Sequence, residues 1–217
     1  DKVFFDFNYS QRDKVYAAHN SEFTEITWFY CSDANSTANG GNGQNDRYVT
    51  YNYSEKVWYY GGLARSAFMD RGAFQYPIGA ESGYLYNHEV GYDDDGSAMS
   101  VSLEASPIDI GDGEKFVSIS RIIPDVSFQG SSTSGAAPSV NMTLSMQDFP
   151  GSPYGQTETD TVSLTSSSTT VPFEQFTTKA DIRLRGRSFS LKLASSGAGV
   201  RWRLGSPRIN IREDGRR

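Results

Sequence analysis

Cysteine and histidine are nearly absent from this sequence, which holds one cysteine, Cys31, and two histidines, His19 and His88. A single cysteine excludes an internal disulfide, and its position after Trp28-Phe29-Tyr30 indicates a buried core residue rather than a reactive thiol. Neither histidine stands at a zinc-ligand spacing, and no nucleophile elbow or glycine-rich phosphate loop occurs. We therefore expect a protein that is not an enzyme and needs no cofactor.

Long hydrophobic runs are also missing. No stretch approaches the roughly 20 apolar residues of a membrane span, and the start does not resemble a secretion leader. We expect a soluble chain with no membrane span. The sequence also lacks an initiator Met and opens directly in the strand-like Val3–Phe7. This suggests that the chain continues a longer polypeptide whose N-terminal part precedes it.

Aromatic and small polar residues are abundant instead. The 217 residues include 13 Tyr, 13 Phe, 3 Trp and 21 Gly. Aromatic side chains suit pleated, half-buried surfaces, and Gly, Ser and Thr suit the turns between strands. The composition predicts an all-β fold.

The first part of the chain, residues 1–110, has the pattern of propeller blades. Short strands alternate with turn signals, and a two-residue connection, Ser54-Glu55, predicts a hairpin. Blades of a β-propeller are four-stranded meanders that recur every ~40 to 50 residues. We therefore predict part of a β-propeller whose remaining blades lie in the preceding sequence. The predicted strands are Val3–Phe7, Asp13–Ala17, Glu25–Cys31, Arg47–Tyr53, Lys56–Tyr60 and Gly83–Glu89.

The second part, residues 111–217, predicts a β-sandwich. After an alternating segment over Met99–Ala105 and the turn-rich Gly111-Asp112-Gly113, six strands of mostly period two follow. The segments Ser131–Pro138 and Ser166–Thr170 are predicted as low-complexity loops. The six strands are Lys115–Ile123, Ser139–Gln147, Asp160–Thr165, Ala180–Leu184, Ser188–Leu193 and Val200–Leu204.

Charge is unevenly distributed along the chain. The net charge is −6, but residues 1–113 have 7 basic and 17 acidic side chains, whereas residues 114–217 have 13 basic and 9 acidic. The first part thus has a net charge of −10 and the second of +4. This asymmetry suggests two domains, or two faces with different partners.

Acidic residues offer two candidate sites. The consecutive carboxylates Asp93, Asp94 and Asp95 precede Gly96 and are either a solvated turn or a turn that holds a cation. A glycosidase needs two carboxylates held across a cleft, and Glu81, Glu89 and Glu104 are the residues from which such a pair would come. Nothing in the sequence selects a pair among them.

Arginines and aromatic residues are the candidate partner-binding residues. Arginines alternate with apolar residues near the C-terminus, which puts them on one face of a strand; this arrangement protects a strand edge, forms salt bridges to a neighbouring subunit, or contacts nucleic acid. Exposed aromatic rings would suit sugars. The arginines are Arg183, Arg185, Arg187, Arg201, Arg203 and Arg212, and the aromatic surface candidates are Trp58, Tyr60, Tyr84 and Tyr86, with Tyr59 beside them.

Several of these sequence segments together resemble a known protein family. The chain resembles the C-terminal region of tail proteins from short-tailed phages. The resemblance lies in Glu25–Tyr30, Asn45–Val49, Tyr51–Tyr53, Val57–Gly61, Leu63–Arg65 and Gly83–Glu89, and in the ending over Arg183–Arg187, Gly199–Gly205 and Arg212–Arg217. The resemblance covers most of the chain, with the loops Ser131–Pro138 and Gly151–Gln156 left out. The similarity is between short sequence segments, and it includes no catalytic signature.

The resemblance implies a virion structural protein, a tail nozzle or tail tubular subunit. Six copies would form a ring below the portal and adaptor, contact tail fibres, and conduct double-stranded genomic DNA during ejection. An acidic wall would keep DNA from sticking in transit. The alternatives are a carbohydrate-binding β module or a receptor-binding tail component, and, last, a glycoside hydrolase.

Overall fold

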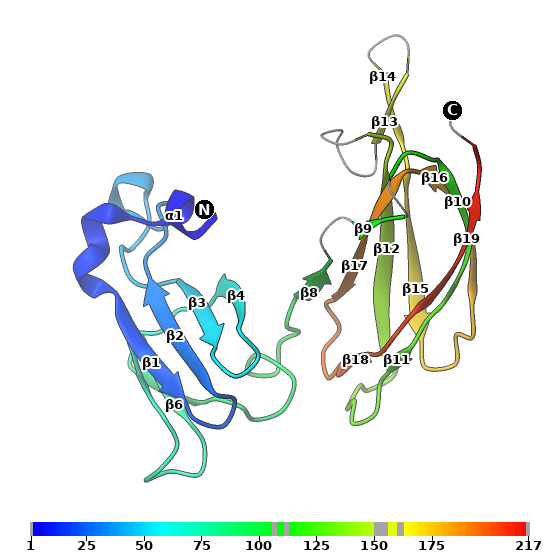
Figure 1. The fold of residues 1–217 in the computed structure, drawn as a ribbon. Helices are drawn as coiled ribbons and strands as arrows, with labels where there is room; N and C mark the ends of the chain where they lie inside the picture. Colours follow the sequence, from blue (N-terminus) through cyan, green and yellow to red (C-terminus); the bar gives the residue numbers. More distant parts are fainter. Residues whose placement is uncertain (1, 106–107, 111–112, 150–155, 160–162, 216–217) are drawn as a thin grey trace. The chain divides into compact units, whose positions relative to one another are not determined.

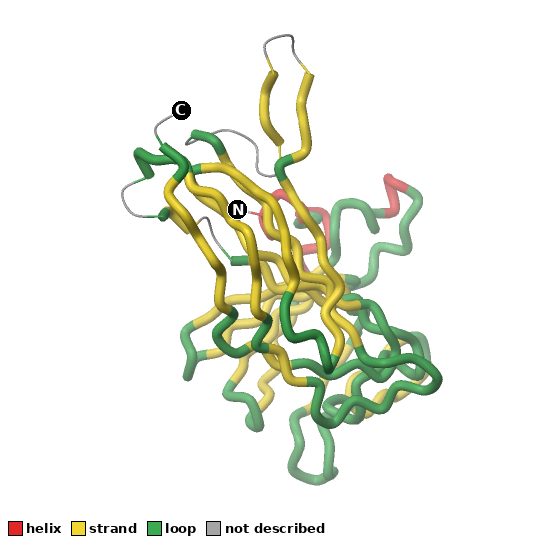
Figure 2. Tube along the Cα trace, turned by 90° about the vertical axis from the view of Figure 1, so that its right-hand side faces the viewer, coloured by secondary structure: helices red, strands yellow, loops and turns green. Residues whose placement is uncertain are grey.

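A computed structural model describes residues 2–105, 108–110, 113–149, 156–159 and 163–215. The protein is all-β, as predicted: its described elements are strands except for helix α1 (Lys2–Asp6) and the 3-10 turns η1 (Tyr9–Lys14) and η2 (Thr37–Asn39) (Figure 2). The strands form several sheets, and none of those in the described residues closes on itself. Two compact units, Asp1–Val90 and Gly91–Arg217, divide the chain.

The first unit contains two antiparallel meanders. The first sheet has the strand order of the sequence, β1 (Tyr16–Asn20), β2 (Glu25–Tyr30), β3 (Arg47–Asn52) and β4 (Val57–Gly62) (Figure 1). The second has β5 (Ala67–Met69), β6 (Ile78–Glu81) and β7 (Tyr84–Asn87). Phe29 of β2, 2% exposed, meets Phe68 of β5 with ring centroids 6.1 Å apart, so these two side chains join the sheets.

The second unit is built on two larger sheets. One contains β16 (Ala180–Gly186), β10 (Val117–Ile123) and β19 (Arg208–Glu213); the other contains β15 (Ser168–Glu174), β12 (Ser139–Gln147), β17 (Ser188–Ser195) and β8 (Val101–Glu104), with β9 (Ile108–Asp109) also on β17. Alternate residues of β10, β12 and β16 are buried, as the period of a strand requires. Their apolar side chains form one hydrophobic cluster with those of β15 and β17. Two short pairs complete the unit, β11 (Val126–Ser127) with β18 (Arg203–Leu204), and β13 (Gln156–Thr159) with β14 (Ser163–Ser166).

The predicted strand Val3–Phe7 is wrong, because residues Lys2–Asp6 form a helical turn. Side chains four residues apart lie on the same side of a helix. Lys2 and Asp6 have this spacing, and both reach the first sheet, where Lys2 Nζ donates to the Tyr60 hydroxyl at 2.9 Å and Asp6 pairs with Arg47 at 3.3 Å. Only Phe7, just after the helix, makes a strand-like bridge, to Ser32.

Several strand boundaries also differ from the prediction. Residues 9–14 are helical, so β1 begins at Tyr16 rather than Asp13. The β3–β4 connection has four residues instead of two, with a left-handed Lys56 (φ 57°). The segment Ser166–Thr170, predicted as a loop, instead contributes to β15, which pairs with β12. The predicted strand Asp160–Thr165 lies partly outside the described residues.

The predicted strand Val200–Leu204 shortens to Arg203–Leu204. Other hydrogen bonds occupy the backbone before it: Gly199 N donates to Asp93, and Arg201 N donates to the Ser131 hydroxyl.

The contacts divide the chain at residue 90, twenty residues before the boundary expected from sequence. The reason is that β8 hydrogen-bonds to β17 and so belongs to the second unit. The net charges of the two units therefore differ from those of the two predicted parts. The first unit has 7 basic and 11 acidic side chains, a net charge of −4, and the second has 13 basic and 15 acidic, a net charge of −2. The acidic segment 91–113 and the arginine-rich strands therefore belong to the same unit.

Candidate functional site

An aromatic face lies on the first sheet, on the side opposite Phe29. We define it as Trp28, Tyr51, Trp58 and Tyr60, which the strand register puts on one face of β2, β3 and β4. Trp58 stacks on Tyr51 at 4.5 Å between ring centroids and lies 5.9 Å from Trp28. Trp58 is nevertheless 62% exposed and Tyr60 54% exposed. Sequence reasoning found Trp58 and Tyr60 but missed Trp28 and Tyr51, which only the register adds.

Strand β4 is also the free edge of this sheet. Of the described strands it pairs with β3 alone, and its consecutive residues Val57–Tyr60 are all exposed. Edge strands in monomeric proteins usually carry charges or proline that prevent pairing with another chain. This strand has neither within Val57–Gly62, so it is open to a partner.

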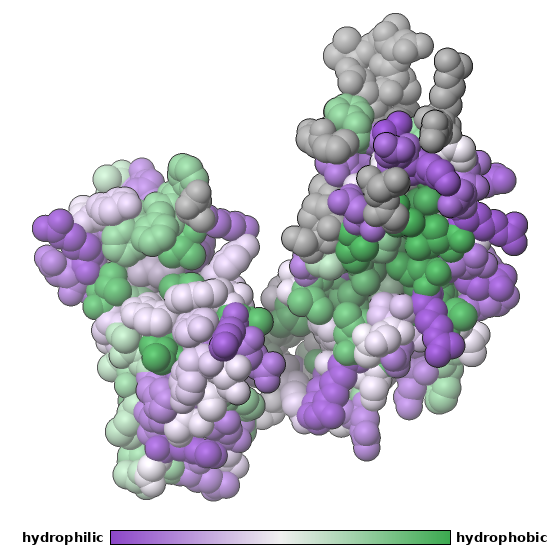
Figure 3. All heavy atoms as spheres, in the orientation of Figure 1, coloured by the Kyte–Doolittle hydropathy of each residue, from purple (hydrophilic) through white to green (hydrophobic). Residues whose placement is uncertain are grey.

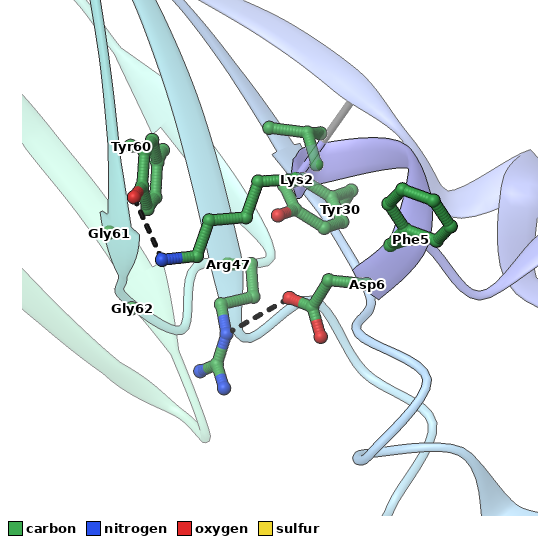
Figure 4. A pocket seen from close by; sticks show the side chains of 9 residues that line it. Lys2, Phe5, Asp6, Tyr30, Arg47, Tyr60, Gly61 and Gly62 are labelled. Carbon is green, nitrogen blue, oxygen red and sulfur yellow. Dashed lines mark hydrogen bonds and ion pairs between the residues drawn. The ribbon is translucent and has the colours of Figure 1, made fainter. Parts of the chain in front are cut away.

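Helix α1 covers one end of the aromatic face. A surface pocket of about 490 Å³ lies between the helix and the ends of β2, β3 and β4 (Figure 4). Lys2, Asp6, Arg47 and Tyr60 line it, and their polar groups already bind one another across it. These contacts across the pocket therefore hold helix α1 on the sheet.

The other two aromatic candidates, Tyr84 and Tyr86, lie on β7 in the second sheet, with ring centroids 6.4 Å apart. Tyr86 lies under the guanidinium of Arg65, 4.6 Å from its ring centre. The four aromatic candidates are thus divided between two sheets and do not form one surface. Tyr84 is 68% exposed, whereas Tyr86 is half-buried.

Arg65, only 6% exposed, organises the polar interior of the first unit. Its Nε donates to His88 Nε2 at 2.9 Å, and its Nη1 donates to Glu81 at 3.2 Å. Gly79 leaves room for this network, because a Cβ there would come within 2.7 Å of Arg65 and 2.6 Å of His88. Sequence reasoning missed Arg65; Glu81 and His88, which it considered, are structural partners of a buried cation.

The remaining carboxylates of the proposed glycosidase set also have partners. Glu89 accepts from Asn20 Nδ2 at 3.1 Å, and burial, reinforced by the nearby Glu25, raises the pKa of Glu89. Glu104 pairs with Lys192 across β8 and β17 at 3.7 Å. None of these contacts forms a pair of carboxylates facing a shared cleft.

A basic face lies on the second unit, on the outer side of β16, β10 and β19. Alternation along the strands points Leu184, Ile119 and Ile211 one way and the arginines the other. Ser118 of β10 pairs with Arg185 on one side and Arg212 on the other, so the register brings together arginines 27 residues apart. In Figure 3, hydrophilic side chains gather on the side where Figure 1 shows β10 and β19. We define the basic face as Arg121, Arg183, Arg185, Arg208 and Arg212, with Asp181 and Asp214 among them.

Two of the five arginines on this face form ion pairs with its aspartates. Arg121 binds Asp181 at 2.7 Å and Arg185 binds Asp214 at 2.6 Å. The hydrogen bond from Arg121 is the main cause that lowers the pKa of Asp181. Among the described residues, Arg183, Arg208 and Arg212 have no ion-pair partner.

The other predicted arginines lie elsewhere. Arg187 follows β16, half-buried, with its guanidinium 4.8 Å from the centre of the Phe116 ring. Arg201 lies over Tyr92 at 5.3 Å, and Arg203 lies on β18 opposite Ser127. The two arginine segments therefore lie on different sheets, since β16 pairs with β10 and β18 pairs with β11.

The acidic turn Asp93–Asp95 is a tight hairpin turn. Asp94 and Ser97 exchange two backbone hydrogen bonds of 2.8 Å around Asp95 and Gly96, which have φ values of 49° and 80°. Asp-Gly is the usual sequence of such a turn, and this signal was present in the sequence. Asp93 accepts a hydrogen bond from Gly199 N. Within the described ranges, no three His, Cys, Asp or Glu side chains gather as metal ligands.

No protein-family model matches this chain, and no curated protein sequence matches it. Among the described residues, no helix has the length and apolar character needed to cross a membrane.

Proposed function

We propose that this chain is a structural subunit of a phage tail nozzle, in which copies assemble into a ring that conducts genomic DNA. The observation that carries the proposal is the uncovered aromatic face. Among the described residues, four of the buried hydrophobic side chains belong to the first unit, whereas fifteen of its large hydrophobic side chains are exposed. Four of them, Val57–Tyr60, are consecutive on edge strand β4, and contiguous exposed apolar surface marks an interaction site. The first unit therefore has the character of one part of a larger assembly.

The strand order supports a propeller part in the first unit. A propeller blade is a four-stranded antiparallel meander whose faces pack against neighbouring blades. The sheet β1–β4 has this order, and the shorter meander β5–β7 packs against one of its faces through Phe29 and Phe68. The aromatic face is the other side of the same sheet. In this proposal a neighbouring copy in the ring covers it.

The second unit supports the β-sandwich part of the proposal. Two sheets contribute to one hydrophobic cluster, which is the arrangement of a sandwich. Its outward faces differ, since one carries the arginines and the other carries Ser, Thr and Asn side chains of β12. A subunit placed in a virion, against portal, adaptor or tail-fibre proteins, needs such distinct faces.

The test is native mass spectrometry combined with electron microscopy on the protein in the full length in which it is expressed. The proposal expects a closed ring, of six copies, with an axial hole wide enough for double-stranded DNA. A compact monomer at every salt concentration would overturn it.

A second candidate, a carbohydrate-binding or receptor-binding tail component, has one observation in its favour. Trp58 stacks on Tyr51 and lies next to Trp28, so the three rings form an aromatic cluster in which Trp58 is 62% exposed. Aromatic planes of this kind bind the apolar faces of sugar rings. Retardation of a monomer on a glycan column, lost in Trp58→Ala, would favour this candidate over the nozzle.

A further inference from the structure

The basic face of the second unit carries more positive charge than its own acids neutralise. Five arginines face two aspartates, which leaves a net charge of +3. Arg183 and Arg212 are exposed and, among the described residues, without an ion pair. Ile123, 44% exposed, pairs with Arg208 and adds an apolar side chain to the same sheet face. A flat face of this kind suits a partner of opposite charge.

The first unit has a matching acidic end. The β1–β2 and β3–β4 turns lie together, because Tyr53 N donates to the Thr24 carbonyl at 3.0 Å. Five carboxylates and two cations, Lys56 and Arg71, surround these turns, and together they have a net charge of −3. Side-chain contacts hold four of these carboxylates near the turns. Arg71 pairs with Glu22 and Ser21 N donates to Asp70. Asn20 donates to Glu89 and Asn52 donates to Glu25. We define the acidic end by these carboxylates: Glu22, Glu25, Glu55, Asp70 and Glu89.

We propose that the basic face of one copy docks on the acidic end of the next copy. This inference rests on the proposed function, since it names the surfaces through which the ring assembles. The two surfaces belong to different units, so the contact joins unlike patches head to tail. Contacts of that kind close into rings when the rotation between copies is right.

A protein partner fits the basic face better than nucleic acid does. Asp181 and Asp214 lie among the arginines and would repel phosphates, whereas in a protein contact they fix the register of opposite charges. The whole chain also has a net charge of −6, which opposes approach to a polyanion. Within the part of the chain that the structure describes, this face has no stack of exposed aromatic rings that would hold bases.

The experiment exchanges the charges on both sides of the contact in the full-length protein. One variant is Arg183→Glu with Arg212→Glu, and the other is Glu22→Lys with Glu55→Lys; all four side chains are exposed. Control reversals at exposed sites outside both surfaces are Arg12→Glu and Glu174→Lys. Sedimentation velocity measures assembly, thermal melting verifies folding, and gel mobility measures binding of double-stranded DNA.

Each exchange alone is expected to weaken assembly at least about 100-fold, because like charges then face each other. Mixing the two variants restores alternating assembly, and a chain with all four substitutions assembles by itself; the controls assemble normally. Restoration in the fourfold variant but not in the mixture would overturn the inference, since the contact would then lie within one chain. Unchanged assembly with altered DNA mobility would overturn it in favour of nucleic acid. If the unsubstituted protein does not assemble, the proposed function fails as well.

Discussion

Truncation of Trp58 to alanine should weaken assembly much more than it lowers the free energy of unfolding. The side chain is 62% exposed in the chain alone. A buried aromatic side chain covers up to about 250 Å², so a partner on the aromatic face would cover roughly 150 Å² more of Trp58. At about 25 cal/mol per Å² this is roughly 4 kcal/mol, and truncation at protein interfaces commonly costs 2 kcal/mol or more. We expect Trp58→Ala to raise the dissociation constant of the assembly by about 30- to 700-fold.

Folding should change much less in the same variant. Loss of the stacking on Tyr51 and Trp28 costs about 0.5 to 1.5 kcal/mol. The assay is a dilution series followed by native mass spectrometry, with urea unfolding as the measure of stability. Phe176→Ala is the control, since Phe176 is 87% exposed but lies outside the aromatic face. An unchanged dissociation constant for Trp58→Ala would refute the role of this face.

Three further substitutions test the internal structure. Gly186→Ala should lower the free energy of unfolding by about 1 to 3 kcal/mol in urea titrations, since its Cβ would lie 2.8 Å from the Cβ of Met146. Burial raises the pKa of Tyr16 to about 12 from 10.0, so the folded protein should lose stability as pH rises from 10 towards 12. Tyr16→Phe should reduce this loss without abolishing it, because burial also raises the pKa of Tyr48 and of Tyr59. The substitution should also add about 1 kcal/mol near neutral pH, because the buried hydroxyl has no hydrogen-bond partner in the described residues. Asp46→Ala should cost about 2 kcal/mol and loosen the loop after β2, measured by hydrogen exchange, because its carboxylate accepts from Ser32 N and Oγ, both at 2.7 Å.

Local sequence patterns predicted several strands closely. Ser139–Gln147 matches β12 from end to end, and Glu25–Cys31 and Arg47–Tyr53 differ from β2 and β3 by one residue each. Cys31, 1% exposed, is buried as predicted. Strand β15 was missed because its Ser and Thr residues have the composition of a loop, and pairing with β12 decides its conformation.

Contacts between distant segments could not be predicted from spacing. Arg183 and Arg212 share a face only because β10, far from both in the sequence, pairs with β16 and β19. Likewise, Trp28 joins Trp58 through the register of three strands. The charge difference between the two halves of the sequence was real, but it did not mark the division into units, because β8 carries its acidic neighbours into the second unit.

Oxidative footprinting of Trp58 and Tyr60, in the isolated chain and in the assembled full-length protein, tests the central claim most directly. Both rings are exposed in the chain alone and should label readily there. If the aromatic face is a contact within a larger assembly, labelling of both should fall at least about tenfold on assembly, while labelling of Phe176 stays the same. Equal labelling of Trp58 and Tyr60 in both states would contradict the account.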